Sequence, residues 1–283
     1  MPAFQSISVE KLFRLIGLPG GPSIIDIRTA DQISERPGLI PGSVRQCTAG
    51  VDGLARHQHG RSIVIACADG HAASQGVAAL LRTSGFDAEI LEGGVTGWED
   101  AGLPLIPESR LPPRDSEGRT RWVTRHRPKV DRIACPWLIR RFVDPSARFL
   151  FVAPADVIAV AGAFHAVPFD IDDDDASYSH SGAECSFDSM LAGFGLAAFE
   201  GLRRLSLIVR GADTGRLEIA PEAAGLLAAS LGLSRMYADD NAQLEAGMAL
   251  YDAFYRWCRD ATAETHGWES HRSPAKRLPG EGR

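Results

Sequence analysis

Residues 62–71 read Ser-Ile-Val-Ile-Ala-Cys-Ala-Asp-Gly-His, and this segment gives the clearest prediction of secondary structure in the first part of the chain. Its apolar, β-branched beginning is typical of a strand buried on both faces, as in a parallel sheet. Small residues follow, and Val77, Leu80 and Leu81 then recur at helical spacing. The stretch therefore predicts a strand, a short loop that starts at Cys67, and a helix.

The same alternation of strand and helix extends on both sides of this stretch. Ser8 can cap a helix that stops at Gly17, and residues 24–27 predict a buried strand. Residues 88–91 predict a further strand, followed by a turn and a helix around Trp98. We expect an α/β fold in which a parallel sheet is flanked by helices.

The chain has 283 residues, which favours two domains. Residues 111–118 have no periodicity and are rich in Pro, Ser and charge, so the boundary is predicted there. The expected parts are an α/β domain over 1–110, a linker over 111–120, a second domain over 121–262 and a polar tail over 263–283.

The second domain is predicted to be mainly α-helical, with a few short strands. Residues 121–124 and 148–152 are the candidate strands, and Pro136 is expected to be the first residue of the helix between them. Helical spacing then dominates the rest of this domain, including a long helix from Asp240.

The composition excludes several classes of protein. No apolar run approaches the ~20 residues that cross a bilayer, and the first residues lack the features of a signal peptide, so we expect a cytoplasmic protein without a membrane partner. The five cysteines are odd in number and scattered, which predicts free thiols.

Charge is unevenly distributed along the chain, whose formal net charge is -6. Residues 111–141 carry nine Lys and Arg against three Asp and Glu, and form a basic island. Such an island attracts oxyanions or phosphates, but the overall negative charge argues against a nucleic-acid partner. The alternative is a solvated linker with its neighbouring helix.

The loop after the first-domain strand can support sulfur chemistry. Small residues that lead into a helix N-terminus allow backbone N–H groups to converge and form a nest for an anion. A thiolate or persulfide on Cys67 would be stabilised there. The alternative is an inert cysteine buried at the end of a strand.

Four motifs in the first domain resemble those of the rhodanese-like family, in the right order. They are Asp26-Ile-Arg28, Ile-Pro-Gly-Ser at 40–43, Cys67-Ala-Asp-Gly70, and Leu-Glu-Gly-Gly-Val at 91–95 with Trp98. The resemblance implies a sulfurtransferase that takes sulfane sulfur from a small-molecule donor such as thiosulfate and passes it to a thiol acceptor, with no cofactor. It also implies a site that contains Cys67, Asp69, Gly70, His71, Asp26 and Arg28.

The loop departs from that family at one position. Many members carry Arg or Lys five residues after the cysteine, where this chain has Ala72. His71 is the nearest replacement cation. Related phosphatases require a loop arginine to hold phosphate, and none lies between Cys67 and Ser74, so phosphatase activity is not expected.

Residues 121–125 and 131–142 resemble the opening of the C-terminal domain of the chromate-resistance ChrB family. The resemblance continues to about residue 262 through Phe169-Asp170, His180-x-Gly182, residues 211–213 and residues 232–235. It implies a role in handling chromate or oxidative stress without naming a reaction. The DNA-binding half that often precedes this domain is replaced by the rhodanese-like one.

Two groups of residues in the second domain are candidates for binding. Arg and Lys beside a thiol can hold an oxyanion such as chromate, and the candidates are Arg125, Lys129, Arg132 and Cys135. Oxygen and nitrogen donors can hold a divalent metal, and the candidates are His180, Glu184 and Asp170. A solvated loop is the alternative for the aspartates at 172–175.

Two functions therefore follow from the sequence. The first is a sulfurtransferase that carries a persulfide on Cys67, with Cys135, Cys185 or a small thiol as acceptor. The second is a non-catalytic sensor that binds an oxyanion or a metal in the second domain.

Overall fold

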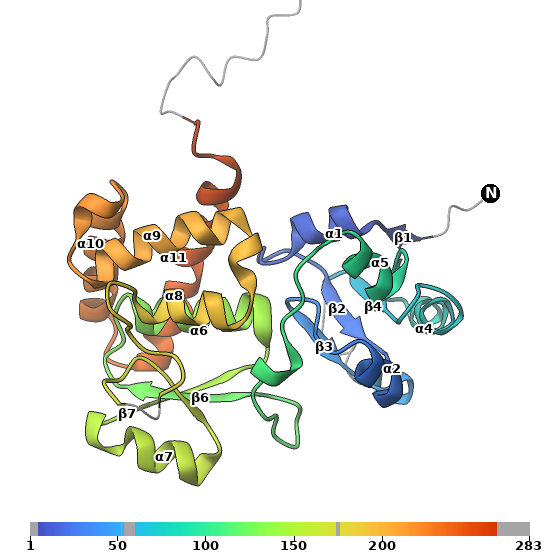
Figure 1. The fold of residues 1–283 in the computed structure, drawn as a ribbon, viewed down its shortest axis with the longest axis horizontal. Helices are drawn as coiled ribbons and strands as arrows, with labels where there is room; N and C mark the ends of the chain where they lie inside the picture. Colours follow the sequence, from blue (N-terminus) through green and yellow to red (C-terminus); the bar gives the residue numbers. More distant parts are fainter. Residues whose placement is uncertain (1–4, 52, 54–59, 174–175, 265–283) are drawn as a thin grey trace, which may run out of the picture.

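The computed structural model describes residues 5–51, 53, 60–173 and 176–264. Two parallel sheets lie next to each other along the length of the molecule, and helices cover both faces of each (Figure 1). The fold is α/β in the first part and mainly helical, with a small sheet, in the second, as the sequence predicted.

The first sheet has the strand order β1-β5-β4-β2-β3, and all of its pairings are parallel. Its strands are β1 (Ser6–Ile7), β2 (Ser23–Asp26), β3 (Ser43–Arg45), β4 (Ile63–Ala66) and β5 (Ala88–Leu91). Its helices are α1 (Val9–Leu15), α2 (Ala30–Glu35), α4 (Ala72–Thr83) and α5 (Gly94–Asp100).

The central strand β4 is buried on both faces. Ile63 and Ile65 belong to a core with residues of α4, whereas Val64 and Ala66 belong to the core that contains α1 and α5. This alternation follows from the two-residue period of a strand and explains why the sequence of β4 is apolar throughout.

The second sheet has the order β7-β6-β8, again with parallel pairings. Its strands are β6 (Arg121–Arg125), β7 (Arg148–Val152) and β8 (Val167–Pro168). Helix α7 (Val157–Phe164) lies on one face (Figure 1). The other helices are α6 (Asp131–Leu138), α8 (Ser186–Gly193), α9 (Glu200–Asp213), α10 (Ala223–Met236) and α11 (Asp240–Asp260).

The helix that was expected to begin at Pro136 begins at Asp131 instead. The N–H groups of Arg132 and Ile133 already bond the carbonyls of Lys129 and Val130 at 2.8 and 3.0 Å. An acidic residue in the first turn favours a start at this position. Pro136 therefore lies inside α6, which continues as a π-helical turn, η3 (Ile139–Val143).

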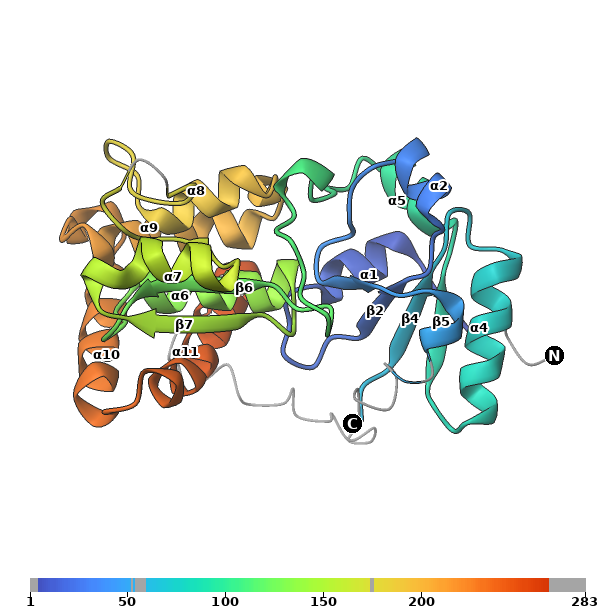
Figure 2. The ribbon, with the colours of Figure 1, turned by 90° about the horizontal axis from the view of Figure 1, so that it is seen from below.

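The two sheets share one hydrophobic core. Phe13 of α1 stacks on Phe199 with ring centroids 4.6 Å apart, and Phe199 in turn contacts Phe142 of η3 at 5.2 Å. The N–H group of Gly42 bonds the carbonyl of Phe142. The face of the first sheet that α1 covers is thus packed against the second part of the chain (Figure 2).

The segment predicted as a linker is ordered by hydrogen bonds. Asp115 accepts from the N–H groups of Glu117 and Arg119 at 2.9 Å. Asp144 accepts from the N–H and hydroxyl groups of Thr120 at 2.7 Å. In the part of the chain that is described, no helix has the length and apolar character required to cross a membrane.

Candidate functional site

Cys67 lies directly after the carboxyl end of β4, where the loop turns into α4. Its Sγ accepts from the N–H group of Gly70 at 3.2 Å. The thiol proton has two acceptors, Ser74 Oγ at 3.2 Å and Asp69 Oδ1 at 3.4 Å. The residue is only 3% exposed, so the sulfur is held in a fixed position at the edge of the sheet.

Two glycines shape this loop. Gly70 has a φ of +74°, and a Cβ there would lie 2.7 Å from the carbonyl oxygen of Leu91. Gly94 has a φ of +58° and contacts the loop from the first turn of α5. The N–H groups of Val95 and Thr96 bond the carbonyls of Cys67 and Ala68, both at 2.9 Å. The start of α5 therefore fixes the backbone that carries the thiol.

The nest that the sequence predicted around the sulfur is shared with a carboxylate. The N–H group of His71 donates to Asp69 Oδ1 at 3.0 Å and is not directed at Cys67. This hydrogen bond, with the one from the Cys67 thiol, lowers the pKa of Asp69. A carboxylate beside the sulfur disfavours an anionic donor, and the loop has no Arg or Lys to compensate.

The resemblance places Asp26 and Arg28 in the site; in the structure their side chains bond each other and not Cys67. Arg28 forms a bidentate ion pair with Asp26, with Nη2 2.7 Å from Oδ2, and both side chains are buried. Arg28 also donates to the carbonyls of Arg36 and Gly38. A buried pair whose hydrogen bonds are satisfied in this way positions the loop after β2.

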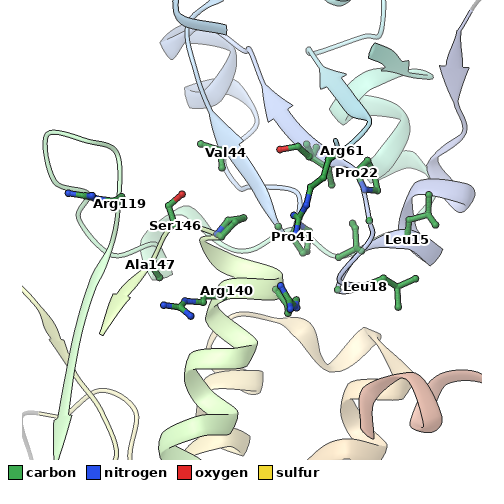
Figure 3. A pocket seen from close by; sticks show the side chains of 18 of the residues that line it. Leu15, Leu18, Pro22, Pro41, Val44, Arg61, Arg119, Arg140, Ser146 and Ala147 are labelled. Atoms are coloured by element: carbon green, nitrogen blue, oxygen red, sulfur yellow. The ribbon is translucent and has the colours of Figure 1, made fainter. Parts of the chain in front are cut away.

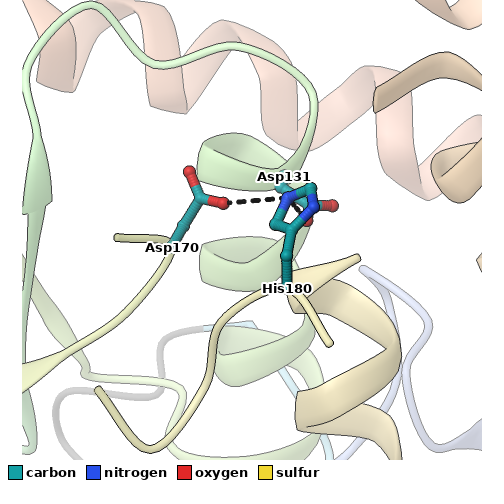
Figure 4. Close-up of side chains that lie close together, drawn as sticks. All are labelled: Asp131, Asp170 and His180. Atoms are coloured by element: carbon teal, nitrogen blue, oxygen red, sulfur yellow. Dashed lines mark ion pairs between the residues drawn. The ribbon is translucent and has the colours of Figure 1, made fainter. Parts of the chain in front are cut away.

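A second group of polar side chains gathers at the carboxyl end of the second sheet (Figure 4). His180 Nε2 lies 3.1 Å from Asp213 Oδ2, 3.5 Å from Asp170 Oδ1 and 3.6 Å from Asp131 Oδ2. Asp131 and Asp170 are buried, whereas His180 is about half exposed. One oxygen of each of these two carboxylates and one nitrogen of His180 all lie within 4.8 Å of one another.

The neighbouring charges set the ionisation of this group. The hydrogen bond with Asp170 raises the pKa of His180 to about 9, helped by the charges of Asp131 and Asp213. Burial, together with Asp213 and Asp170, raises the pKa of Asp131 well above its usual range. Burial opposes ionisation of Asp170 as well, but its bonds to His180 and Ser186 hold its pKa below the usual value.

The structure brings together only part of the predicted metal set. Asp170 and His180 lie side by side, but Glu184 is outside the group. Asp131 and Asp213 belong to the group although the metal prediction did not include them. Asp174 and Asp175 lie outside the described residues.

The predicted oxyanion set is not assembled as a site. Arg125 and Arg132 both pair with Asp170 Oδ2 at 3.2 Å. Cys135 is fully buried, and burial raises the pKa of its thiol well above the usual value. Lys129 is exposed. The guanidinium groups of Arg125 and Arg132 therefore form ion pairs with Asp170, and the thiol of Cys135 is not accessible to solvent.

Cys185 is buried like Cys135, and burial raises the pKa of its thiol as well. A thiol that is buried and protonated is a poor sulfur acceptor. A direct relay from Cys67 to either cysteine, as the sequence suggested, would require the helices around these thiols to open.

Five arginines line a cleft of about 940 Å³ between the two sheets (Figure 3). They are Arg61, Arg119, Arg140, Arg141 and Arg148. Arg61 precedes β4 and Arg148 begins β7, so the cleft lies at the amino ends of the strands, opposite the Cys67 loop. Among the described residues, neither of these two arginines forms an ion pair, whereas Arg140 and Arg141 pair with Glu245 and Asp252.

Two family models match the chain in succession. Residues 9–101 match the rhodanese-like domain, and residues 122–258 match the C-terminal domain of ChrB. The protein named ChrB of Cupriavidus metallidurans is 33% identical over 199 residues, which cover 64% of this chain and 57% of that protein. The chain thus spans little more than half the length of this relative.

Solved structures match the first part of the chain. A rhodanese-related protein of Thermoplasma volcanium is 20% identical over 36% of this chain and 98% of its own, with a TM-score of 0.32. A rhodanese-like domain protein of Staphylococcus aureus is 29% identical over 35% and 96%, with a TM-score of 0.31. A thiosulfate sulfurtransferase of Pseudomonas aeruginosa is 22% identical over 38% and 20%, with a TM-score of 0.33.

Proposed function

We propose that the first part of the chain is a sulfurtransferase that carries sulfane sulfur as a persulfide on Cys67. The observation that carries this proposal is the position of Sγ, between the N–H group of Gly70 and the first turn of α4. The first N–H groups of a helix have no partner within it. They can stabilise the negative charge of an outer sulfur that extends from Cys67.

The reaction has two balanced steps. The Cys67 thiolate attacks the sulfane sulfur of a donor, a new S–S bond forms, and the donor leaves with the electrons of its broken bond to sulfur. An acceptor thiolate then attacks the outer sulfur of the persulfide, which restores the Cys67 thiolate. A small thiol is the proposed acceptor, because Cys135 and Cys185 are buried.

The charge of the loop limits the donors. Asp69 lies beside the sulfur, and Ala72 stands where a cation would hold a dianion such as thiosulfate. A neutral or singly charged donor, such as an organic persulfide or thiosulfonate, meets less repulsion. The cytoplasm, where thiols stay reduced, is the compartment in which we expect this reaction.

Intact-mass measurement tests the proposal directly. After exposure to a thiosulfonate and, separately, to thiosulfate, the wild-type protein should gain one sulfur, faster with the thiosulfonate. Cys67→Ser should abolish the gain, because it removes the thiol that lies at the N–H group of Gly70 and the start of α4. Cys47→Ser, which changes the exposed cysteine, is the control and should load normally. A sulfur adduct that persists in Cys67→Ser, or none in the wild type, would contradict the proposal.

The match to the ChrB C-terminal domain supports a role of the whole protein in handling chromate or oxidative stress. A second candidate function, binding of an oxyanion such as chromate, is favoured by the arginine cleft. The proposed position for the oxyanion is therefore this cleft and not Arg125 and Arg132, because both of those arginines pair with Asp170.

Removal of the two arginines of the cleft that form no ion pair within the described residues should weaken oxyanion binding. We expect the Arg61→Ala, Arg148→Ala variant to lose about tenfold or more in affinity for chromate or sulfate, since a charge-assisted hydrogen bond contributes about 1.5–3 kcal/mol. Calorimetric titration measures this loss, and Arg235→Ala, an exposed arginine of α10, serves as the control. Equal affinity of both variants for the oxyanion would contradict the proposal that the cleft is its binding site.

A further inference from the structure

Buried polar atoms without partners are concentrated at one place in the second sheet. In the described part of the chain, four buried side-chain atoms have no hydrogen-bond partner, and three of them are Thr124 Oγ1, Arg125 Nε and Asp131 Oδ1. All three belong to the short segment that joins the end of β6 to the start of α6. A buried polar atom without a partner is costly. Arg125 Nε is an N–H donor of a cationic group and would not meet a cation, whereas Asp131 Oδ1 is a carboxylate oxygen that can bind one.

The strand order makes the same edge a binding position. The chain passes from β6 through α6 to β7 on one side, and then through α7 to β8 on the other side of β6. The connections that leave β6 and β8 therefore diverge at the carboxyl ends of these strands. Open parallel sheets bind ligands at such a point. Arg125 ends β6, Asp170 follows β8, and the two side chains meet at 3.2 Å.

The donor atoms that converge there are those of a cation site. Asp131 and Asp170 face the imidazole nitrogen of His180 (Figure 4), and the carboxylate of Asp213 lies 3.1 Å from the same nitrogen. Carboxylate oxygens and a histidine nitrogen together suit divalent Mn, Fe or Zn. The carboxylate of Asp131 is buried; its Oδ2 faces His180, and its Oδ1 has no hydrogen-bond partner. His180 is about half exposed and leaves the group open to solvent.

We propose that Asp131, Asp170 and His180 bind a divalent transition metal ion, with Asp213 as a fourth ligand. The ion would lie between the imidazole nitrogen of His180 and the carboxylates. Its positive charge would relieve the repulsion between the carboxylates.

The surrounding contacts orient these ligands. Arg125 and Arg132 hold Oδ2 of Asp170, which leaves Oδ1 directed at His180. The N–H groups of Ser186 and Phe187, at the start of α8, bond Asp131 Oδ2 at 2.6 and 3.3 Å. Hydrogen bonds of this kind fix the direction of metal ligands and are needed for full affinity. The site is thus held by residues from β6, α6 and α8 as well as by its own ligands.

Calorimetric titration of the full-length, chelator-treated protein with Mn²⁺ tests the proposal, because Mn²⁺ prefers oxygen and nitrogen ligands to the protein's thiols. We expect one ion per chain. His180→Ala should weaken binding by at least about tenfold, and Asp213→Asn should also weaken it. His126→Ala is the matched control, since it removes an exposed histidine outside the group, and should leave the affinity unchanged.

The ligand atoms can be checked separately with Co²⁺. Binding at this site should give d–d absorption without a thiolate charge-transfer band, and a melting temperature that rises with Co²⁺ in the wild type but not in His180→Ala. Three results would overturn the proposal: no saturable binding of Mn²⁺, equal binding by wild type and His180→Ala, or a thiolate band. Each result is independent of sulfur loading on Cys67.

Discussion

Replacing Phe142 by alanine is expected to lower the free energy of unfolding by about 3–5 kcal/mol, the usual cost of removing a buried aromatic ring. The Phe142 ring is fully buried among Trp137, Phe199 and Tyr255, with ring centroids 5.2–5.9 Å apart. It also covers Gly17, at the end of the turn that follows α1. Because both sheets depend on this ring, urea unfolding should shift as a single transition.

A matched phenylalanine provides the control. Phe164, the last residue of α7, is 52% exposed, so Phe164→Ala should change stability by less than about 1 kcal/mol. Circular dichroism and tryptophan fluorescence should report the same midpoint for each variant. Two separate transitions, of which Phe142→Ala moves only one, would show that the sheets do not unfold as a unit.

Local patterns in the sequence predict the helices and strands, but they do not predict which of these elements contact one another. The helix at Ser8, the strand before Cys67 and the strands predicted at 121–124 and 148–152 all follow from periodicity and capping within a few residues, and the structure extends the first of these two to Arg125. The contact of Phe13 with Phe199 joins residues far apart in the chain. Both are apolar residues of their own helical segments, and nothing local shows that their partners lie in the other half.

The same holds for the candidate sites: the sequence predicts residues that share a local motif, but not those that only the fold brings together. Cys67 and Gly70 were found because their loop carries its own short motif, and the structure places them together. Asp131 is absent from the predicted metal set, because its partner Ser186 is 55 residues away. Asp26 and Arg28 belong to a motif that resembles the rhodanese-like family, but in the structure their charged groups form an ion pair with each other. Only the folded chain shows which charges remain available.

Replacing Gly94 by alanine is expected to slow sulfur loading of Cys67 strongly, although Gly94 contacts no substrate. A Cβ at this position would lie 2.7 Å from both Ala68 C and Asp69 N. These atoms are backbone and cannot rotate away, so the loop must shift. A displacement of about 1 Å from the productive geometry can reduce a rate about 100-fold. We expect a loss of that order in the rate of persulfide formation, followed by intact mass.

Gly102→Ala is the control that distinguishes the effect of this steric clash from the effect of backbone strain. Gly102 has a φ of +68°, close to the +58° of Gly94, but a Cβ there would meet no heavy atom within 4 Å in the described structure. Both variants should lose about 1–2 kcal/mol of stability from the left-handed backbone. Only Gly94→Ala should also lose sulfur loading, because only its side chain displaces the segment that carries the thiol. Equal loading rates in the two variants would mean that α5 does not set the position of Cys67.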